Sequence, residues 1–280
     1  MSVHVARDLP DALAALADRP DADLLAGGTD LMVEINFGRR RPAHVIAIDR
    51  VAELREATVN GSVRLGAGVT FARVLAEDLG SVALREAART VGSPQIRSAA
   101  TIGGNLATAS PAGDALPVLA ALDATVVLRS PRGERRVPVV DWMTGPKRSV
   151  RLRDEIVTAV EWEDAGPKQT FMKVGARNAM VIAVASLAVV ADPARGRFGV
   201  ALGSCAPTVV RAPEAEAFAA DVLGDRRYGF TPSEAACAEF GRLVAAAARP
   251  IDDVRGTAAY RRHVLAVMGA RALARVARLA

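Results

Sequence analysis

The sequence is poor in lysine and in aromatic residues, and both shortages bear on what the protein can bind. Only 4% of the 280 residues are aromatic, and the three lysines are Lys147, Lys168 and Lys173. The net charge of +5 comes from arginines that are scattered among acidic residues. Surfaces that bind nucleic acid combine clustered basic residues with aromatic rings that stack on bases. The composition therefore argues against a nucleic-acid-binding protein.

Cysteine and histidine are too few and too dispersed for a metal centre. Cys205 and Cys237 form no Cys-x-x-Cys motif, and His4, His44 and His263 are isolated from one another. Structural zinc sites and iron–sulfur clusters need several such ligands, often at short spacings. We expect no metal held by this chain alone, reduced thiols, and no hydrolytic triad built on histidine.

Long apolar runs are also lacking. The longest, MVIAVASLAVVA at 180–191, falls short of the roughly 20 residues that a membrane span needs. The N-terminal MSVHVARDLPDALAAL carries charges where a signal peptide has an apolar segment. We therefore expect a soluble, cytoplasmic protein. Apolar residues still make up 51% of the chain, enough for the core of one large domain or two modest ones.

Capping residues and hydrophobic patterns predict alternating helices and strands in the first half. Asp8 caps a helix to about residue 18, strands follow at 44–48 and 62–71, and a helix starts near Thr70. The segment 119–130 passes from helix to strand, and a hairpin turns at Gly133. Glycines and prolines at 145–170 mark the transition to a second unit.

The second unit is predicted to begin with strands and to end with helices. The segments 170–175, 182–192 and 197–205 are either consecutive strands or strands combined with a helix. Thr231 to Glu234 form a capping box, with Pro232 at the first helical position. One face of the final helix carries Tyr260, Val264, Met268, Ala272, Val276 and Leu279. These elements indicate an α+β fold in at least two parts.

Two glycine pairs are the main candidates for a binding site: AGGTD at 26–30 and TIGGN at 101–105. Paired glycines adopt backbone conformations that are closed to other residues, and successive N–H groups in such turns attract anions. Thr29, Thr101, Asn105, Thr108 and Ser110 add neutral hydrogen-bonding groups. Either pair alone could be an ordinary tight turn. Together, in a chain with so few lysines, they favour a diphosphate bound by the main chain.

Rival motifs are missing. The P-loop pattern GxxxxGK followed by Ser or Thr does not occur, nor does the nucleophile pattern GxSxG. GAGVTFA at 66–72 approaches GxGxxG but has Phe71 at the third glycine position, where its bulk prevents close packing of helix on strand.

Long stretches around these glycine pairs resemble a known family. LLAGGTDLMVEINFGRRRPAHVIAIDRVAELRE and VGSPQIRSAATIGGNLATASPAGDALPVLAALDA are similar to the FAD-binding medium subunit of molybdenum-containing hydroxylases, the xanthine dehydrogenase and aerobic carbon monoxide dehydrogenase family. LRDEIVTAVEW, FMKVGARNAMVIAVASLAVV, VALGSCAPTVVRAPEAE and VRGTAAYRRHVLAVMGARALARV follow in the family's order. The resemblance covers nearly the whole chain.

The resemblance implies a fold and a division of labour. Residues 1–165 would form a vanillyl alcohol oxidase-type FAD-binding domain, with subdomains at about 1–52 and 53–165, and residues 166–280 a smaller C-terminal α+β domain. This subunit would take electrons from [2Fe–2S] clusters on a small subunit onto FAD and pass them to an external acceptor. A large subunit would hydroxylate the substrate at its molybdenum cofactor, in a heterotrimer that dimerises. The resemblance implies no catalytic residue and no metal ligand in this chain.

The resemblance also assigns cofactor-binding residues. The first segment comprises Ala26, Gly27, Gly28, Thr29 and Asp30, and the second comprises Thr101, Ile102, Gly103, Gly104 and Asn105. Thr108, Ser110 and Asp114 match positions at the ribityl or diphosphate part, and Val157 and Lys173 match positions beside the isoalloxazine ring. A cation near the ring stabilises reduced, anionic flavin. The resemblance therefore predicts a lower flavin potential for Lys173→Met.

Some residues depart from the family pattern. Ser98 stands where asparagine is frequent, and Gly113 where some relatives have serine. Thr29 and Asp30 replace the histidine and serine usual in carbon monoxide dehydrogenases, which argues against that substrate. The cysteine-rich insert of relatives with an additional cluster is missing. Neither the hydroxylated substrate nor the acceptor (NAD, quinone, dioxygen or a carrier protein) follows from the sequence.

Alternatives remain for the function of the chain and for the roles of single residues. The chain could be a free-standing FAD-dependent oxidoreductase acting on a small molecule, or a flavin-free scaffold. A self-sufficient oxidase would need a Tyr, His or Arg near the ring, whereas Tyr228 and Tyr260 fall in the helical C-terminal part. Lys173 could lie on the surface, and Asp114 could cap a helix that starts near Leu116. Arg97 and Arg177 could reach phosphate or a partner.

Overall fold

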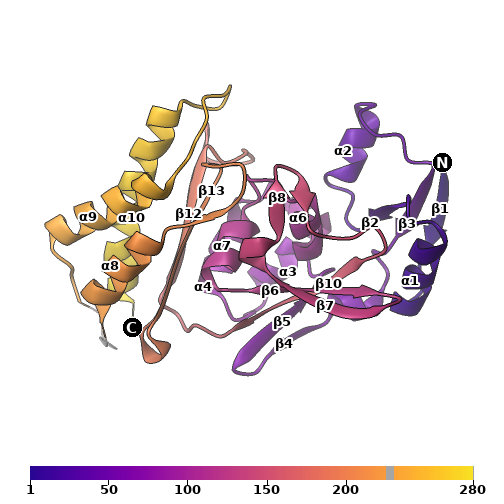
Figure 1. Cartoon of the computed structure of the whole chain (residues 1–280), viewed down its shortest axis with the longest axis horizontal. Helices are drawn as coiled ribbons and strands as arrows, with labels where there is room; N and C mark the ends of the chain where they lie inside the picture. The colour runs from indigo at the N-terminus through magenta and orange to yellow at the C-terminus, as the bar shows by residue number, and fades with distance from the viewer. Residues whose placement is uncertain (225–229, 280) are drawn as a thin grey trace.

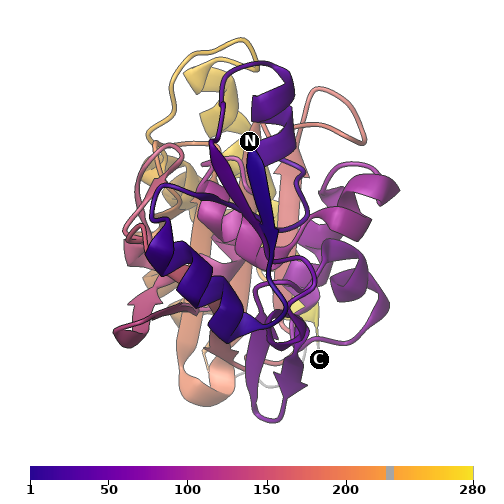
Figure 2. The same cartoon turned by 90° about the vertical axis from the view of Figure 1, so that its right-hand side faces the viewer.

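The computed structural model describes residues 1–224 and 230–279, which form three blocks side by side along the long axis (Figure 1). The first block, seen face-on in Figure 2, holds a three-stranded parallel sheet in the order β1-β3-β2. Its elements are β1 (Ser2–Val5), α1 (Leu9–Asp18), β2 (Asp23–Leu25), α2 (Leu31–Asn36) and β3 (His44–Ala47). Asp8 caps α1 as predicted, and a small core of Leu16, Ile46 and Leu54 joins the sheet to α1.

The middle block is a five-stranded antiparallel sheet, in the order β4-β5-β10-β6-β7, with helices packed on it. Its elements are η1 (Ala52–Arg55), β4 (Ala57–Val59), β5 (Ser62–Gly66), α3 (Phe71–Ala76), α4 (Val82–Thr90), α5 (Pro94–Ala99), α6 (Ile102–Thr108), α7 (Ala115–Ala121), β6 (Thr125–Ser130), β7 (Gly133–Pro138), η2 (Val139–Asp141), β8 (Met143–Gly145), β9 (Arg148–Ser149) and β10 (Ile156–Glu163).

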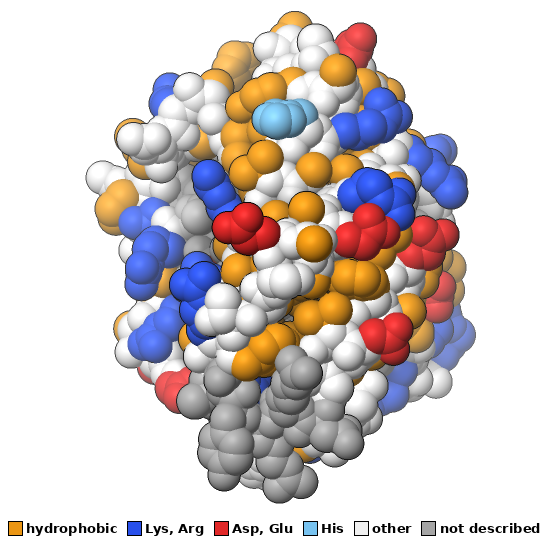
Figure 3. All heavy atoms as spheres, turned by 90° about the vertical axis from the view of Figure 1, so that its left-hand side faces the viewer, with side chains coloured by type: hydrophobic (Ala, Val, Ile, Leu, Met, Phe, Trp, Pro, Cys, Tyr) orange, Lys and Arg blue, Asp and Glu red, His pale blue; other side chains and the backbone are white. Residues whose placement is uncertain are grey.

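The third block is a four-stranded antiparallel sheet in the order β11-β12-β13-β14, with three helices on its outer face. Its elements are β11 (Gln169–Val174), β12 (Ala185–Asp192), η3 (Pro193–Arg195), β13 (Arg197–Gly203), β14 (Val210–Arg211), α8 (Pro213–Leu223), α9 (Glu234–Ala247) and α10 (Ala258–Arg278). Figure 3 shows this end of the molecule, where hydrophobic side chains form a band between charged ones. None of the described helices combines the length and the apolar character of a membrane span.

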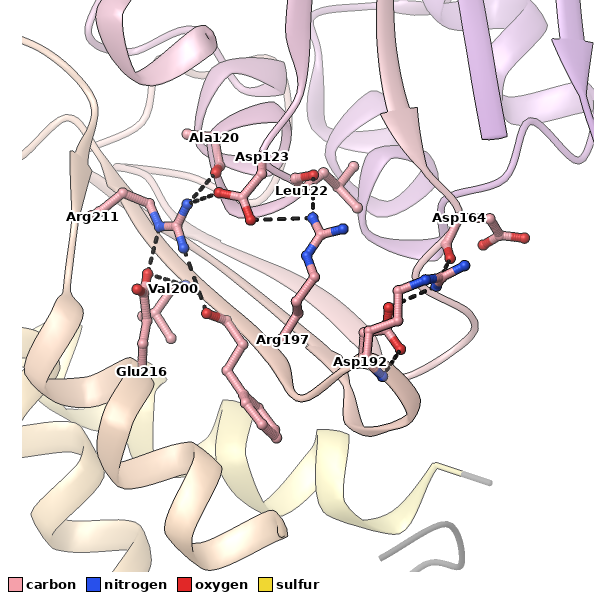
Figure 4. Close-up of polar contacts among 11 residues, drawn as sticks. Ala120, Leu122, Asp123, Asp164, Asp192, Arg197, Val200, Arg211 and Glu216 are labelled. Atoms are coloured by element: carbon pink, nitrogen blue, oxygen red, sulfur yellow. Dashed lines mark hydrogen bonds and ion pairs between the residues drawn. The ribbon is translucent and has the colours of Figure 1, made fainter. Parts of the chain in front are cut away.

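Helix α7 joins the middle block to the third block. All of its residues are buried, and it packs against β12 and β13 of the third sheet. A Cβ atom on Gly199 of β13 would lie 1.9 Å from the carbonyl oxygen of Ala121, so only glycine allows this approach. Figure 4 shows the polar contacts beyond the end of α7, where Asp123 accepts hydrogen bonds from Arg197 and Arg211. The two blocks therefore share one hydrophobic core and are also joined by the polar contacts of Asp123.

The α+β prediction is confirmed, while several local predictions need correction. The segments 170–175, 182–192 and 197–205 contain the three strands β11, β12 and β13, so the helical alternative is wrong. The strand predicted at 62–71 ends at Gly66, because the backbone at Gly66 and Gly68 turns against the Leu54 carbonyl.

The capping box at Thr231 is also wrong. Helix α9 begins at Glu234, and Ser233 caps it by accepting a hydrogen bond from the Ala236 N–H. The preceding segment is held outside the helix, because Pro232 is buried and the Phe230 N–H donates to the Ala277 carbonyl of α10. On α10 itself, Tyr260 is 47% exposed instead of facing the core.

Its neighbour Arg261 is buried in place of Tyr260. The Arg261 guanidinium donates to the carbonyls of Val184 and Ser204 and pairs with Asp253. Fixed oxygen acceptors thus bind both terminal nitrogens of this buried guanidinium, while its Nε has no partner among the described residues. Apolar periodicity gives no signal for such a residue.

Candidate functional site

A cleft of about 1010 Å³ runs between the first and middle blocks, and the third block contributes Ile182 to its wall. Both glycine segments line it, although Thr101 lies 71 positions after Asp30 in the chain. Of the fifteen predicted cofactor-binding residues, twelve line the cleft. The other three, Ile102, Asp114 and Lys173, lie behind its wall.

The first glycine segment is an open turn between β2 and α2. Gly28 has φ +70°, in the left-handed region that favours glycine. A Cβ atom on Gly27 would lie 1.7 Å from the Ala99 carbonyl oxygen, so this glycine lets the turn touch the segment before α6. Within the described residues, the backbone N–H groups of Gly27, Gly28, Thr29 and Asp30 have no acceptor. Such a run of free donors can bind an anion.

The second glycine segment has a different structure from the one predicted. Gly103 and Gly104 belong to α6, which Thr101 caps by accepting from the Gly104 N–H at 2.9 Å. The N–H groups of Ile102 and Gly103 donate to backbone carbonyls of residues 69 and 67. The prediction of a second nest of free N–H groups is therefore wrong. The signal for this helix in the sequence was Thr101, because threonine often caps a helix by accepting a hydrogen bond from the N–H group three residues later.

The second segment still faces the cleft through small and polar groups. A Cβ atom on Gly104 would meet only the Thr101 hydroxyl within 4 Å, at 3.0 Å. Asn105, Thr108 and Ser110 line the same wall. The side-chain oxygen of Asn105 is buried and has no hydrogen-bond partner within the described structure. Because an unpaired buried acceptor is costly, this oxygen is a ready partner for a ligand donor.

Behind the wall, Lys173 of β11 and Asp114 form an ion pair of 2.6 Å between the third and middle blocks. Their side chains are only 7% and 6% exposed, so Lys173 is not a surface lysine. Thr90 donates to the same carboxylate at 3.1 Å. Burial raises the pKa of the Asp114 carboxyl, against the opposing pull of the Lys173 ammonium. Asp114 occupies the N-cap position of α7, which begins at Ala115 close to the predicted start, but its side chain makes no capping bond to the helix.

Arginines on the cleft wall were missed by sequence reasoning. Arg40, Arg55, Arg73 and Arg151 line the cleft. Arg40 pairs with Asp23, and Arg151 donates to the Glu155 carbonyl at 2.6 Å. Burial lowers the pKa of Arg151. These arginines are spread along the sequence, so no local motif predicts that they share a site.

Other candidates have structural partners or lie elsewhere. Arg97 donates to the Val91 and Gly92 carbonyls, and Arg177 donates to carbonyls of its own loop. Tyr228 lies outside the described residues, and Tyr260 is not part of the cleft wall. Among the described residues, no histidine, cysteine, lysine or tyrosine lines the cleft. The described residues also contain no cluster of side chains that could hold a metal ion.

The cleft thus offers free main-chain donors at one segment and small polar groups at the other, as a dinucleotide requires. A sequence profile described as the FAD binding domain in molybdopterin dehydrogenase matches residues 1–162. The chain belongs to this family of FAD-binding subunits. A second profile, the CO dehydrogenase flavoprotein C-terminal domain, matches residues 170–276 of the flavoprotein. FAD is therefore its cofactor.

Named relatives agree over most of this flavoprotein. It is 35% identical over 227 residues to the xanthine dehydrogenase FAD-binding subunit of Escherichia coli, covering 77% of each chain. It is 31% identical over 281 residues to the glyceraldehyde dehydrogenase medium chain of Sulfolobus acidocaldarius, covering 97% of this chain and 96% of the other. A solved structure of carbon monoxide dehydrogenase from Hydrogenophaga pseudoflava superimposes with a TM-score of 0.87 at 28% identity, covering 100% of this chain and 98% of the other.

Proposed function

We propose that this flavoprotein is the electron-transfer subunit of a molybdenum hydroxylase. It takes electrons from [2Fe–2S] clusters on a small partner subunit and passes them to an external acceptor. The observation that carries the proposal is the cleft, which we assign to FAD and call the flavin cleft. The wall of the cleft, as far as the structure describes it, provides main-chain donors but no histidine, cysteine, lysine or tyrosine to act on an organic substrate. The arginines on this wall are engaged by other groups of the protein: Arg40 by Asp23, Arg55 by the Asp49 carbonyl, Arg73 by Glu77 and Arg151 by the Glu155 carbonyl. FAD supplies the redox chemistry, and the protein positions it.

We assign the cofactor contacts as follows. The free N–H groups from Gly27 to Asp30 hold the diphosphate, assisted by donation from the Asn105 amide NH2 group and from the hydroxyls of Thr108 and Ser110. Val157 and Ile182 bound the space for the flavin ring. Ile102, Asp114 and Lys173 support the wall from behind and do not contact the cofactor.

We further propose the partners. Relatives include the nicotine 6-hydroxylase medium subunit of Paenarthrobacter nicotinovorans, 32% identical over 262 residues. The word medium implies a larger and a smaller subunit in that enzyme. By analogy, this chain joins a large subunit with the molybdenum cofactor and a small subunit with the iron–sulfur clusters. The complex would be a cytoplasmic dimer of heterotrimers.

The test is to purify the tagged full-length chain from its native cells. We expect the flavin absorption band, two further subunits, and molybdenum and iron by elemental analysis. A lone chain that carries flavin and oxidises a small molecule without partners would favour the free-standing oxidoreductase. A chain without flavin would favour the scaffold.

A further inference from the structure

Lys147 occupies a position in the fold where a lysine is unexpected. It follows Pro146 in the two-residue turn between β8 and β9, and its φ is +56°. Turn positions with positive φ usually take glycine or asparagine, because most other side chains collide with the backbone there. Lysine is also rare in this chain, which uses arginine for most of its positive charge. Residues held in such strained conformations cluster at ligand clamps and switch regions.

Lys147 is bonded to both walls of the flavin cleft. Its N–H group donates to the Ala109 carbonyl at 2.9 Å, at the end of α6, and the residues on either side of Ala109 line the cleft. Its ammonium lies 2.7 Å from the Glu34 carboxylate of α2 and 3.9 Å from that of Asp30. These two acidic residues line the wall formed by the first glycine segment. One residue therefore joins the two walls.

The contact of Lys147 with Glu34 is the polar link between α2 and the middle block. Figure 1 shows α2 projecting from the first block, with β8 and α6 across from it. Within the described residues, no hydrogen bond or ion pair other than those of Lys147 joins residues 26–38 to residues 52–163. Helix α2 has six residues, none of them buried. Because a short helix with few buried contacts opens more easily than the core, this wall can move when the contact breaks.

The ion pair is suited to a contact that forms and breaks. The side chains of Lys147 and Glu34 are 53% and 23% exposed. The hydrogen bond from Lys147 holds the pKa of the Glu34 carboxyl below its ordinary value, so the carboxylate is charged at neutral pH. Exposed ion pairs are weak and are screened by salt. Such a pair holds the two walls together without fixing them permanently.

We propose that Lys147 is a latch across the flavin cleft, which controls how fast FAD enters and leaves. This inference rests on the proposed function, in which FAD occupies the cleft, and adds a residue that regulates its exchange. A diphosphate held from Gly27 to Asp30 leaves when the wall that carries α2 moves away from α6, and the contact of Lys147 with Glu34 opposes that movement. Because Lys147 does not line the cleft, the latch joins protein to protein and forms whether or not FAD is bound.

Loss of the latch should speed exchange in both directions. Lys147→Asn removes the ammonium and keeps a residue type that tolerates positive φ, so the turn is preserved. We expect FAD to leave and to bind about two- to fivefold faster, the range typical of an exposed ion pair, with a nearly unchanged Kd. Glu34→Gln removes the other half of the latch and should have the same effect. The double variant should be no faster than either single variant.

Stopped-flow measurements of flavin fluorescence on the full-length chain give both rates. Arg148→Gln is the matched control, because it removes a positive charge from the next residue, which forms no ion pair with the described part of the chain. Its rates should equal those of the wild type. The difference between the wild type and Lys147→Asn should shrink in about 1 M KCl, where salt screens charges over short distances.

Wild-type rates in Lys147→Asn, or equal acceleration in Arg148→Gln, would overturn the inference. So would a slower release of FAD from Glu34→Gln, because Lys147 would then act as a counter-ion that offsets acidic residues near the diphosphate. A higher Kd for Lys147→Asn without faster binding would also overturn it, since Lys147 would then contact the cofactor itself. A wild-type chain that binds no FAD would instead contradict the proposed function.

Discussion

At the scale of single residues, the glycine pairs serve two different purposes. Gly27 and Gly103 are required because protein atoms fill the space of a side chain, with the Ala99 carbonyl 1.7 Å and the Ala67 side chain 2.4 Å from a hypothetical Cβ. Gly104 meets only the Thr101 hydroxyl. The sequence indicates that these positions need glycine, but it does not show whether a neighbouring segment of the protein or a ligand requires it.

Gly104→Val should therefore abolish FAD retention. Gly104 lines the cleft, so a valine side chain would take space from the diphosphate and disturb the cap at Thr101. The ratio of flavin to protein absorbance after purification measures the effect. Ala246→Val on the exposed side of α9 is the control for a branched residue in a helix. A Gly104→Val protein with its full complement of flavin would contradict the site.

Lys173→Met should destabilise the fold by about 3–5 kcal/mol, because it leaves the Asp114 carboxylate buried without its partner. Denaturant unfolding of the FAD-loaded chain measures this loss. The double variant with Asp114→Asn should recover much of it, and a purely additive result would show that the pair does not interact. The ion pair carries no net charge, and neither of its residues lines the cleft. The lower flavin potential that the resemblance implies for Lys173→Met therefore stays a prediction.

At the scale of elements, capping signals and glycine turns predicted several of the helices and strands, but tertiary contacts moved several ends. Asp8 caps α1 as predicted, and Thr70 caps α3, the helix predicted to start near it, because both capping bonds are local. At α9 the predicted box moved by two residues, since a bond to α10 holds the chain extended before it. At the second glycine segment, the carbonyls of the turn after β5 likewise accept from the first N–H groups of α6, so these groups are not free for an anion.

Ser233→Ala should lower stability by about 1 kcal/mol, and Thr231→Ala should have little effect. The Ser233 hydroxyl accepts from the Ala236 N–H at 3.1 Å, which the alanine variant loses. The midpoints of thermal unfolding of the two variants provide the comparison. Equal losses of stability in the two variants would contradict the cap at Ser233 and favour one at Thr231.

At the scale of the whole molecule, the order of the blocks and the shared cleft could be expected from the family resemblance, whereas the contacts between blocks could not. The pairs formed by Lys173 with Asp114 and by Arg211 with Asp123 join residues 59 and 88 positions apart. No local pattern links such residues, because their proximity is a product of packing. The boundaries predicted at residues 52 and 165 stay predictions.

Stability of the whole molecule should fall in acid partly through Glu155. Desolvation raises the pKa of this buried carboxyl, but bonds from Arg135 and the Leu152 N–H outweigh it and hold the pKa below its ordinary value. Its contribution is therefore complete above the unfolded pKa, about 4.3, and is lost as the pH falls through the folded value. The thermal midpoint of the wild type should drop more steeply below that pH than that of Glu155→Gln. Parallel curves would contradict this assignment.

The enclosed helix α7 has a consequence for protein engineering. It belongs by sequence to the middle block, but the strands of the third block press against its backbone through Gly199. A chimera that joins this FAD-binding half to a relative's C-terminal half would pair unfamiliar strands with that helix. The unit to exchange is therefore the C-terminal half together with α7. A crossover placed between β10 and β11 would leave α7 packed against strands that it does not fit.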